Sequence, residues 1–121
     1  MNTIGASIVT IEPGKVEIEF PFSRSLTRQH DYIHAGILTA VVDNACGYAA
    51  YTLMPADSEV LTIEYEVNFM SPAKGELFKA VGRVLEPGRN ITVCAGDAIA
   101  VDQGKEKTVA TMLATMMMVK G

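Results

Sequence analysis

The N-terminal part of the chain alternates apolar and polar residues in two short segments on either side of Pro13-Gly14. In residues 16–20 the apolar positions Val, Ile and Phe are separated by single glutamates. A period of two places the apolar side chains on one face of a strand, and Pro-Gly is a typical turn pair. We therefore expect two strands between residues 7 and 22, joined at this turn.

The longest apolar run predicts the one long helix of the chain. It follows a polar segment without a steady period (residues 23–34), begins near Ala35, reaches about Leu53 and is followed by Pro55. Its apolar positions go nearly all round a helical axis, which is typical of a helix enclosed by other structure. Because proline cannot continue a helix, we expect the helix to end before it.

Four further strands are predicted after the helix. In residues 61–69 the alternation places Leu61 and Ile63 on one face and Thr62 on the other. The remaining three strands are separated by turn sequences of hairpin length, and they span residues 76–85, 90–101 and 108–119. Such short connections indicate a four-stranded meander. The whole order predicts an α+β fold, in which a curved antiparallel sheet wraps around one long central helix.

Composition narrows the class of protein. The 121 residues are 49% hydrophobic, which suits one compact domain over residues 1–121. With a net charge of −4 and scattered lysines and arginines, neither nucleic acid nor a membrane is an expected partner. No apolar run reaches the ~18 residues of a membrane span, and no signal-peptide pattern is present. Cys46 and Cys94 lie in apolar segments, which favours buried thiols and a cytoplasmic location.

The start of the helix, His34-Ala35-Gly36, has the features of a site for a developing negative charge. The first N–H groups of a helix have no intrahelical partner, and the helix dipole adds to their attraction for anions. Small residues let a substrate carbonyl approach this backbone, as the oxyanion hole of an acyl-transfer enzyme requires. The alternative is a tight helix entry without chemistry.

Asp43 stands in the middle of the apolar helix, where an unpaired carboxylate is costly. It is a candidate general base that activates water, or a nucleophile that attacks a thioester carbonyl, and the sequence does not choose between these roles. The structural alternatives are a carboxylate capped by the hydroxyl of Tyr48 or Thr39, or one in a salt bridge. For the neighbouring Asn44 we favour a hydrogen bond that serves helix packing.

Helix geometry separates the two candidate groups. Asp43 follows Ala35 by eight residues, so at 1.5 Å per residue they lie ~12 Å apart along the axis. One acyl carbon cannot touch both groups of the same chain. If both serve one thioester, the acid must come from a second protomer whose helix runs antiparallel beside the first. We therefore expect an obligate dimer with two equivalent interfacial sites.

These residues resemble the phenylacetyl-CoA thioesterase branch of the hotdog-fold superfamily, the branch that includes acyl-CoA thioesterase 13. The family signature combines a His-Gly-Gly helix start, an Asp on the helix, a strand followed by Ser-Pro, and a Gly-Arg hairpin. The corresponding segments here are HAG at 34–36, VDNACGYAA at 42–50, VNFMSPAKGE at 67–76 and GRN at 88–90. The resemblance covers most of the chain and implies hydrolysis of acyl-CoA by a homo-oligomer, a dimer at least and often a tetramer.

The resemblance also implies roles for individual residues. The N–H of Ala35 polarises the thioester carbonyl, Gly36 supports the turn, and Asp43 is the catalytic carboxylate. Thr62 takes the place of a hydroxyl residue that orients the attacking water, although strand alternation makes a surface threonine an equal alternative. His34 is a candidate general base that ranks below Asp43, and the role that the resemblance mainly implies for it is to shape the loop through hydrogen bonds.

Other positions of the resemblance are less closely matched or concern coenzyme A. The motif HGG is HAG here, which a backbone donor tolerates. An Asn that binds the carbonyl or water in relatives is replaced by Arg28, and Gln29 is the candidate substitute; a solvated loop is the alternative. Arg89, followed by Asn90, is the candidate contact for coenzyme A phosphates. No metal-ligand spacing and no phosphate loop is present, so no metal or cofactor is expected.

Two other functions remain open at this point. A hotdog hydratase or dehydratase would consume a 2-enoyl thioester without releasing free thiol. A non-catalytic acyl-CoA-binding module would bind the thioester without turnover and would not need Asp43. Assays of free thiol and of binding separate all three functions.

Overall fold

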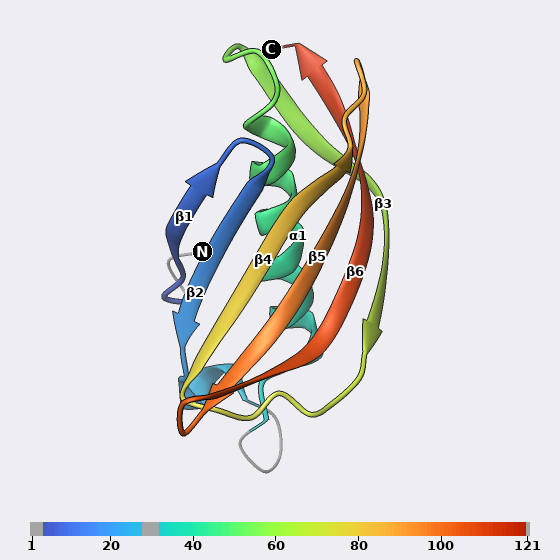
Figure 1. The fold of residues 1–121 in the computed structure, drawn as a ribbon. Coiled ribbons are helices and arrows are strands. Elements are labelled where there is room, and N and C mark those ends of the chain that lie inside the picture. The colour runs from blue at the N-terminus through green and yellow to red at the C-terminus, as the bar shows by residue number, and fades with distance from the viewer. Residues whose placement is uncertain (1–3, 28–31, 121) are drawn as a thin grey trace.

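The computed structural model describes residues 4–27 and 32–120, which form one antiparallel sheet and one long helix (Figure 1). The strands are β1 (Ser7–Glu12), β2 (Lys15–Pro21), β3 (Ser58–Phe69), β4 (Leu77–Glu86), β5 (Ile91–Asp102) and β6 (Lys105–Lys120). The helices are the short 3-10 helix η1 (Arg24–Leu26) and α1 (Ala35–Tyr51). The predicted α+β class, a curved sheet around a central helix, is confirmed.

The order of the strands differs from the predicted meander. The sheet order is β1-β2-β4-β5-β6-β3, so of the four strands after α1 only β4, β5 and β6 follow one another as neighbours. β3 pairs with β6 at the edge of the sheet, and residues 70–76 carry the chain along the end of the sheet to β4 (Figure 1). The prediction was wrong because residues 70–76 are long enough to pass the ends of β5 and β6, the two strands that lie between β3 and β4 in the sheet. The correction leaves β1 and β3 as the two edge strands.

The helix side of the sheet combines large side chains in β2 with small ones in the central strands. Val16, Ile18 and Phe20 of β2 are fully buried, as the alternation predicts, and Phe20 stacks on Phe78 with ring centroids 5.2 Å apart. The buried small residues on this side of the central strands include Ala80, Gly82, Gly96, Ala98, Ala100, Ala110 and Ala114. Small residues at these positions let the helix backbone lie close to the sheet.

The helix and the sheet lie close together at two glycines in neighbouring strands. Gly82 and Gly96 are register partners in β4 and β5. A Cβ on Gly82 would meet helix backbone, with the Ala45 carbonyl oxygen and the Cys46 nitrogen each 2.5 Å away. A Cβ on Gly96 would meet side chains, at 2.6 Å from Val42 and 2.8 Å from Cys46. These two positions therefore fix how near the middle of α1 lies to the sheet.

The N-terminal hairpin is attached to the C-terminal end of α1. Its turn uses Gly14 at a φ of 79°, a conformation that L side chains rarely adopt. The Gly14 N–H donates to the Thr52 hydroxyl over 2.7 Å, and this hydroxyl donates in turn to the Ala49 carbonyl at 2.6 Å. Because Thr52 caps the last turn, α1 ends at Tyr51, slightly before the predicted end near Leu53.

Within one chain the sheet covers only one side of α1. The buried residues of α1 follow the three- and four-residue spacing of a single face, and they are Leu38, Val41, Val42, Ala45, Cys46, Ala49 and Ala50. On the other side Ala40 and Tyr48 are exposed. The expectation of a helix enclosed on all sides is therefore wrong for the chain by itself, since the second face stays open.

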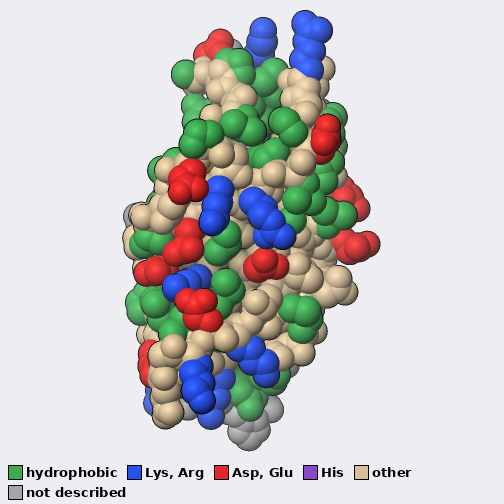
Figure 2. Space-filling model, viewed as in Figure 1, with side chains coloured by type: hydrophobic (Ala, Val, Ile, Leu, Met, Phe, Trp, Pro, Cys, Tyr) green, Lys and Arg blue, Asp and Glu red, His purple; other side chains and the backbone are tan. Residues whose placement is uncertain are grey.

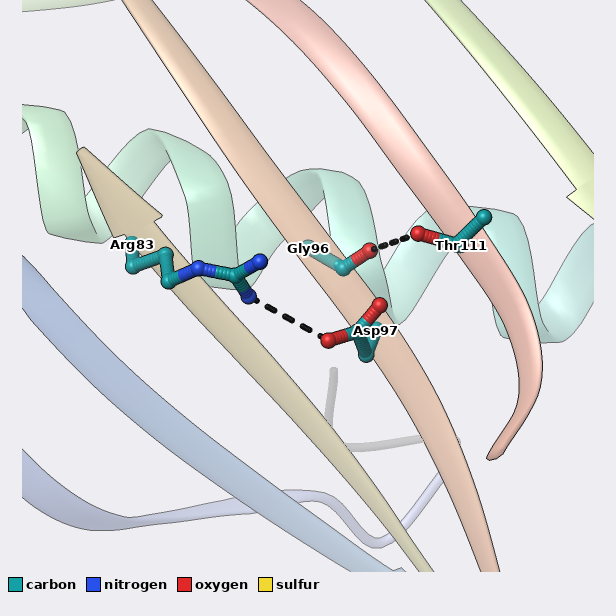
Figure 3. A network of polar contacts seen from close by, with 4 residues as sticks. All are labelled: Arg83, Gly96, Asp97 and Thr111. Atoms are coloured by element: carbon teal, nitrogen blue, oxygen red, sulfur yellow. Dashed lines mark hydrogen bonds and ion pairs between the residues drawn. The ribbon is translucent and has the colours of Figure 1, made fainter. Parts of the chain in front are cut away.

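The face of the sheet away from the helix carries charged side chains of both signs (Figure 2). Arg83 donates to the Asp97 carboxylate over 3.2 Å, beside the Thr111 hydroxyl, which donates to the Gly96 carbonyl over 3.4 Å (Figure 3). Lys79 pairs with Glu106 over 2.7 Å nearby. Such interspersed charges are typical of a solvated surface.

The two cysteines are buried and unpaired, as expected. The Cys94 thiol lies 3.5 Å from the Cys46 carbonyl oxygen, to which it donates. Burial, with smaller contributions from neighbouring charges for Cys46, raises the pKa of Cys46 to about 12 and the pKa of Cys94 to about 11. Both groups are therefore inert thiols of the core at neutral pH. No helix in the described ranges has the length and apolar character that crossing a bilayer requires.

Candidate active site

The start of α1 presents backbone donors at the surface. The His34 N–H donates to the Leu26 carbonyl over 3.0 Å, and the His34 carbonyl accepts the N–H groups of Ile37 and Leu38. No acceptor from the described residues binds the N–H of Ala35 or Gly36. Gly36 is exposed, and a Cβ there would have no atom within 4 Å. Among the described residues, these N–H groups are therefore left without an acceptor at the positive end of the helix dipole.

The order of this loop comes from the main chain of His34. The residue is the N-cap of α1, but its side chain makes no capping hydrogen bond and is exposed. The loop is further fixed by the Ile33 N–H, which donates to the Ala73 carbonyl over 3.0 Å. Gln29 lies outside the described residues.

The structure brings Asp43 and Thr62 together from different elements. The Thr62 hydroxyl of β3 lies 2.8 Å from Asp43 Oδ1 of α1 and 3.3 Å from the Met116 sulfur of β6. The hydroxyl has one proton, and a carboxylate is a much stronger acceptor than a thioether. The hydroxyl therefore donates to Asp43. The hydroxyl of Thr39 was one of the two that could cap Asp43 in a purely structural role. It donates instead to the Ala35 carbonyl over 2.9 Å.

A β-bulge explains how Thr62 can face the helix together with the apolar residues that follow it in the strand. Thr62 pairs with Met116, whereas Glu64 pairs with Thr115, so Ile63 is an extra residue in β3. Directly opposed residues share a face of the sheet, and Met116 is fully buried on the helix side. The bulge therefore reverses the parity of the strand. Thr62 thus lies opposite Leu61, as the alternation predicts, and what the alternation does not indicate is the bulge at Ile63, which brings the later apolar residues Tyr65 and Val67 to the same face as Thr62.

Asp43 and Thr62 line an open hollow of about 380 Å³ beside the free face of α1. The other residues around it are Asn44, Gly47, Tyr48, Tyr51 and Val60. A Cβ on Gly47 would have no atom within 4 Å, so packing within the chain does not require a glycine there. Sequence analysis missed Gly47 and Tyr51, although helical spacing of four and eight residues from Asp43 could have indicated them. Asn44 donates to the Ala40 carbonyl over 3.0 Å, in agreement with a packing role.

The remaining candidates lie at different ends of the fold. The helix start with Ala35 is at one end of the sheet, and the hairpin between β4 and β5 with Arg89 and Asn90 is at the other (Figure 1). Both hairpin residues are exposed, and the Asn90 carbonyl accepts the N–H of Met118. One unbroken helix separates Ala35 from Asp43, so the ~12 Å rise between them stands. In the described ranges no three His, Cys, Asp or Glu side chains are grouped as metal ligands would be.

Comparison with known proteins identifies the family of this arrangement. The family model described as "Thioesterase superfamily" matches residues 30–107. The crystal structure of a thioesterase family protein from Silicibacter pomeroyi is 49% identical, with a TM-score of 0.98 over 100% of this chain and 89% of that one. The PaaI protein of the E. coli phenylacetic acid degradation operon shares the fold, with 20% identity and a TM-score of 0.86 over 99% and 83% of the two chains.

Curated relatives align with most of the chain but with less of their own length. A Saccharolobus solfataricus protein named "Putative esterase" is 34% identical over 92 residues, which are 76% of this chain and 61% of the relative. A 1,4-dihydroxy-2-naphthoyl-CoA hydrolase from Listeria monocytogenes is 23% identical over 76% and 75% of the two chains. The chain thus spans less than two thirds of the archaeal esterase it matches. Its family-model match and its likeness to the Silicibacter protein show that the chain belongs to the thioesterase superfamily.

Proposed function

We propose that the protein hydrolyses acyl-CoA thioesters to a free acid and coenzyme A, in the manner of the phenylacetyl-CoA thioesterase branch of its superfamily. The observation that carries this proposal is the Asp43 carboxylate, held by the Thr62 hydroxyl at 2.8 Å beside an open hollow. Asp43 lies on the open face of α1, so packing of the helix against the sheet does not require a carboxylate at this position. The name of the Listeria relative, a CoA thioester hydrolase, supports the same substrate class.

The chemistry divides between a backbone donor and a carboxylate. The N–H of Ala35 stabilises the negative charge that develops on the thioester oxygen during attack. Asp43 either removes a proton from the attacking water or attacks the carbonyl itself, in which case water then hydrolyses the anhydride. In either route a C–O bond forms, the C–S bond breaks, and the departing thiolate of coenzyme A takes up a proton. The hydrogen bond from Thr62 holds the carboxylate in position.

The ~12 Å between Ala35 and Asp43 makes a second copy of the chain necessary for this chemistry. Two features of the chain support such a dimer. β3 is a long edge strand, and Leu61, Ile63, Tyr65 and Phe69 on it are about half exposed. The helix face that carries Asp43 is also open. A two-fold axis that pairs β3 with its copy sets the two helices antiparallel and brings the partner's helix start toward Asp43.

The remaining parts of the proposal concern the nucleotide, the assembly and the compartment. Arg89 and Asn90 are exposed in a hairpin, where a guanidinium suits the phosphates of coenzyme A. A tetramer of two dimers is the larger assembly that the family resemblance implies. The free thiols of Cys46 and Cys94, close but unpaired, favour a reducing cytoplasm.

The catalytic role of Asp43 is tested by Asp43→Asn, which keeps the size of the side chain and removes its charge. We expect hydrolysis of a panel of acyl-CoAs, followed as free thiol, to fall about a hundredfold or more, the typical contribution of a general base. Asp97→Asn, on the far face of the sheet, is the matched control and should stay near the parent. Activity of Asp43→Asn within about tenfold of the parent would show that the assignment is wrong.

The shared site is tested by mixing two inactive variants. Ala35→Pro removes the N–H donor at the first helical position, where proline is well tolerated, and His34 already has the extended ψ of 136° that precedes proline. If each site combines Ala35 of one chain with Asp43 of the other, a mixed dimer with Asp43→Asn has one intact site. Random mixing then restores about a quarter of the parental activity, since half the dimers are mixed. No recovery in verified mixed dimers would mean that the site lies within one chain.

A further inference from the structure

A second, more apolar hollow lies between the N-terminal hairpin and the last turns of α1. Its volume is about 630 Å³, which is within the range of small-molecule sites. The residues around it are Ile8, Ile11, Glu12, Pro13, Val16, Tyr48, Tyr51, Thr52, Met54 and Ala56. Most of these side chains are apolar, and the floor at Val16 is fully buried. The hollow therefore suits an apolar ligand.

A β-bulge in β1 turns two isoleucines toward this hollow. Ile8 pairs with Ile18, and Ile11 pairs with Val16. From Ile8 to Ile11 is three positions along β1, but from Val16 to Ile18 is only two along β2, so β1 contains one extra residue. Both partners face the helix and are fully buried, so Ile8 and Ile11 also lie on the helix side. Val9 is the extra residue of the bulge. Ile8 and Ile11 remain 42% and 64% exposed, so the described residues leave a large part of both side chains uncovered.

The apolar hollow adjoins the hollow of Asp43. Tyr48 and Tyr51 line both, and these tyrosines follow Asp43 on α1 by five and eight residues, a rise of ~12 Å for the longer step. The Tyr51 hydroxyl donates to the Ala56 carbonyl over 2.8 Å, which fixes this ring at the boundary. Gly47 leaves the helix surface without a side chain between Asp43 and the tyrosines, and a Cβ there would meet no atom. A path along the helix therefore leads from the carboxylate to the apolar hollow.

We propose that this hollow receives the far end of the acyl group, so that the preferred substrates are thioesters of medium-length, linear apolar acids. The inference rests on the proposed function, because the carbonyl must lie at Asp43 for the acyl chain to run this way. The polar hollow holds the reacting carbonyl, and the apolar hollow takes the methylene groups beyond Tyr48 and Tyr51. Each methylene that is buried should strengthen binding about fourfold, the equivalent of about 0.8 kcal/mol at 1.4 kcal/mol per tenfold.

The test compares Ile11→Asn with Val9→Asn. Both positions are exposed apolar residues of the same edge strand, but only Ile11 lines the hollow. In the parent, kcat/KM should rise from butyryl-CoA through octanoyl-CoA to decanoyl-CoA. Ile11→Asn should lower kcat/KM for decanoyl-CoA about tenfold and leave butyryl-CoA within about twofold, because an amide in the hollow disfavours only the groups that reach it. Val9→Asn should leave the whole series unchanged.

Binding without turnover keeps this inference separate from the proposed function. The probe is S-decyl-coenzyme A, a thioether that cannot be hydrolysed, titrated by calorimetry into both variants beside free coenzyme A. A loss of affinity for the decyl compound in Ile11→Asn alone supports the hollow as the acyl site, even if no thioester is cleaved. Equal affinity in both variants, a chain-length profile that Ile11→Asn does not change, or a change of oligomeric state in place of specificity would overturn it.

Discussion

The close contact between α1 and the sheet makes Gly82→Ala a severe substitution. The added Cβ would lie 2.5 Å from the Ala45 carbonyl oxygen and from the Cys46 nitrogen. These are backbone atoms in the middle of a helix, and they cannot move away by a change of rotamer. The helix would have to shift from the sheet, and the shift would leave voids around neighbouring buried residues.

Three glycines with different surroundings allow the effect of the same substitution, glycine to alanine, to be compared. Overpacking of a core costs about 1–3 kcal/mol, and because backbone opposes the Gly82 methyl we expect about 3 kcal/mol for Gly82→Ala. Gly96→Ala meets the side chains of Val42 and Cys46, which can adjust, and should cost about 1–2 kcal/mol. Gly47→Ala meets nothing within 4 Å in its own chain, and alanine favours a helix, so it should be the least destabilising of the three.

The assay is urea unfolding at one fixed protein concentration, because association contributes to the stability of an oligomer. A thermal melt should show the same order, and ~3 kcal/mol would lower Tm by roughly 10 °C in a chain of this size. The order of stability, Gly47→Ala first, then Gly96→Ala and finally Gly82→Ala, is the prediction. If Gly82→Ala unfolds within about 0.5 kcal/mol of the parent, the helix does not lie as close to β4 as the structure has it.

Three further predictions concern single groups. Thr62→Val removes the hydrogen bond to Asp43 and should lower kcat/KM about tenfold, whereas Thr62→Ser should restore most of it; equal activity of the two variants would exclude a positioning role. Burial raises the pKa of Cys46 to about 12 from an ordinary 9.0, so folding favours the protonated thiol. Stability should then fall as pH rises above about 9, less steeply in Cys46→Ala, and an unchanged slope would contradict this. The exposed pair of Lys79 should contribute under about 1 kcal/mol, so a larger loss in Lys79→Ala by urea unfolding would show that the pair is not merely a surface contact.

The local pattern of the sequence predicted most of the elements. Alternation in β2 gave the buried row of Val16, Ile18 and Phe20, and the Pro-Gly pair gave the turn that the structure places at the end of α1. These features depend on neighbouring residues, whose periodicity reflects a single buried face. The short helix η1 was not predicted, because its three residues form no apolar period.

Strand order could not be derived in the same way, because it depends on contacts between distant segments. Nothing in residues 58–69 indicates whether their partner is the strand that follows or the last strand of the chain. The small residues of the central strands, such as Gly82 and Gly96, could have indicated which strands lie at the centre of the sheet. A pair of glycines in neighbouring strands suits the part of the sheet that a helix crosses closely, so both strands were candidates for its centre.

The position of Thr62 shows most clearly what a periodic pattern omits. The alternation of β3 reads without a break through Ile63, and a bulge leaves no mark on a pattern of apolar and polar residues. Yet the bulge solves a conflict. The strand needs a hydroxyl on the helix side at Asp43, and it also needs Tyr65 and Val67 on that side, opposite the buried Ala114 and Met112. In a regular strand, Thr62 would lie on the face opposite to Tyr65 and Val67. Such a strand could orient Thr62 toward Asp43 only if Tyr65 and Val67 turned away from the helix.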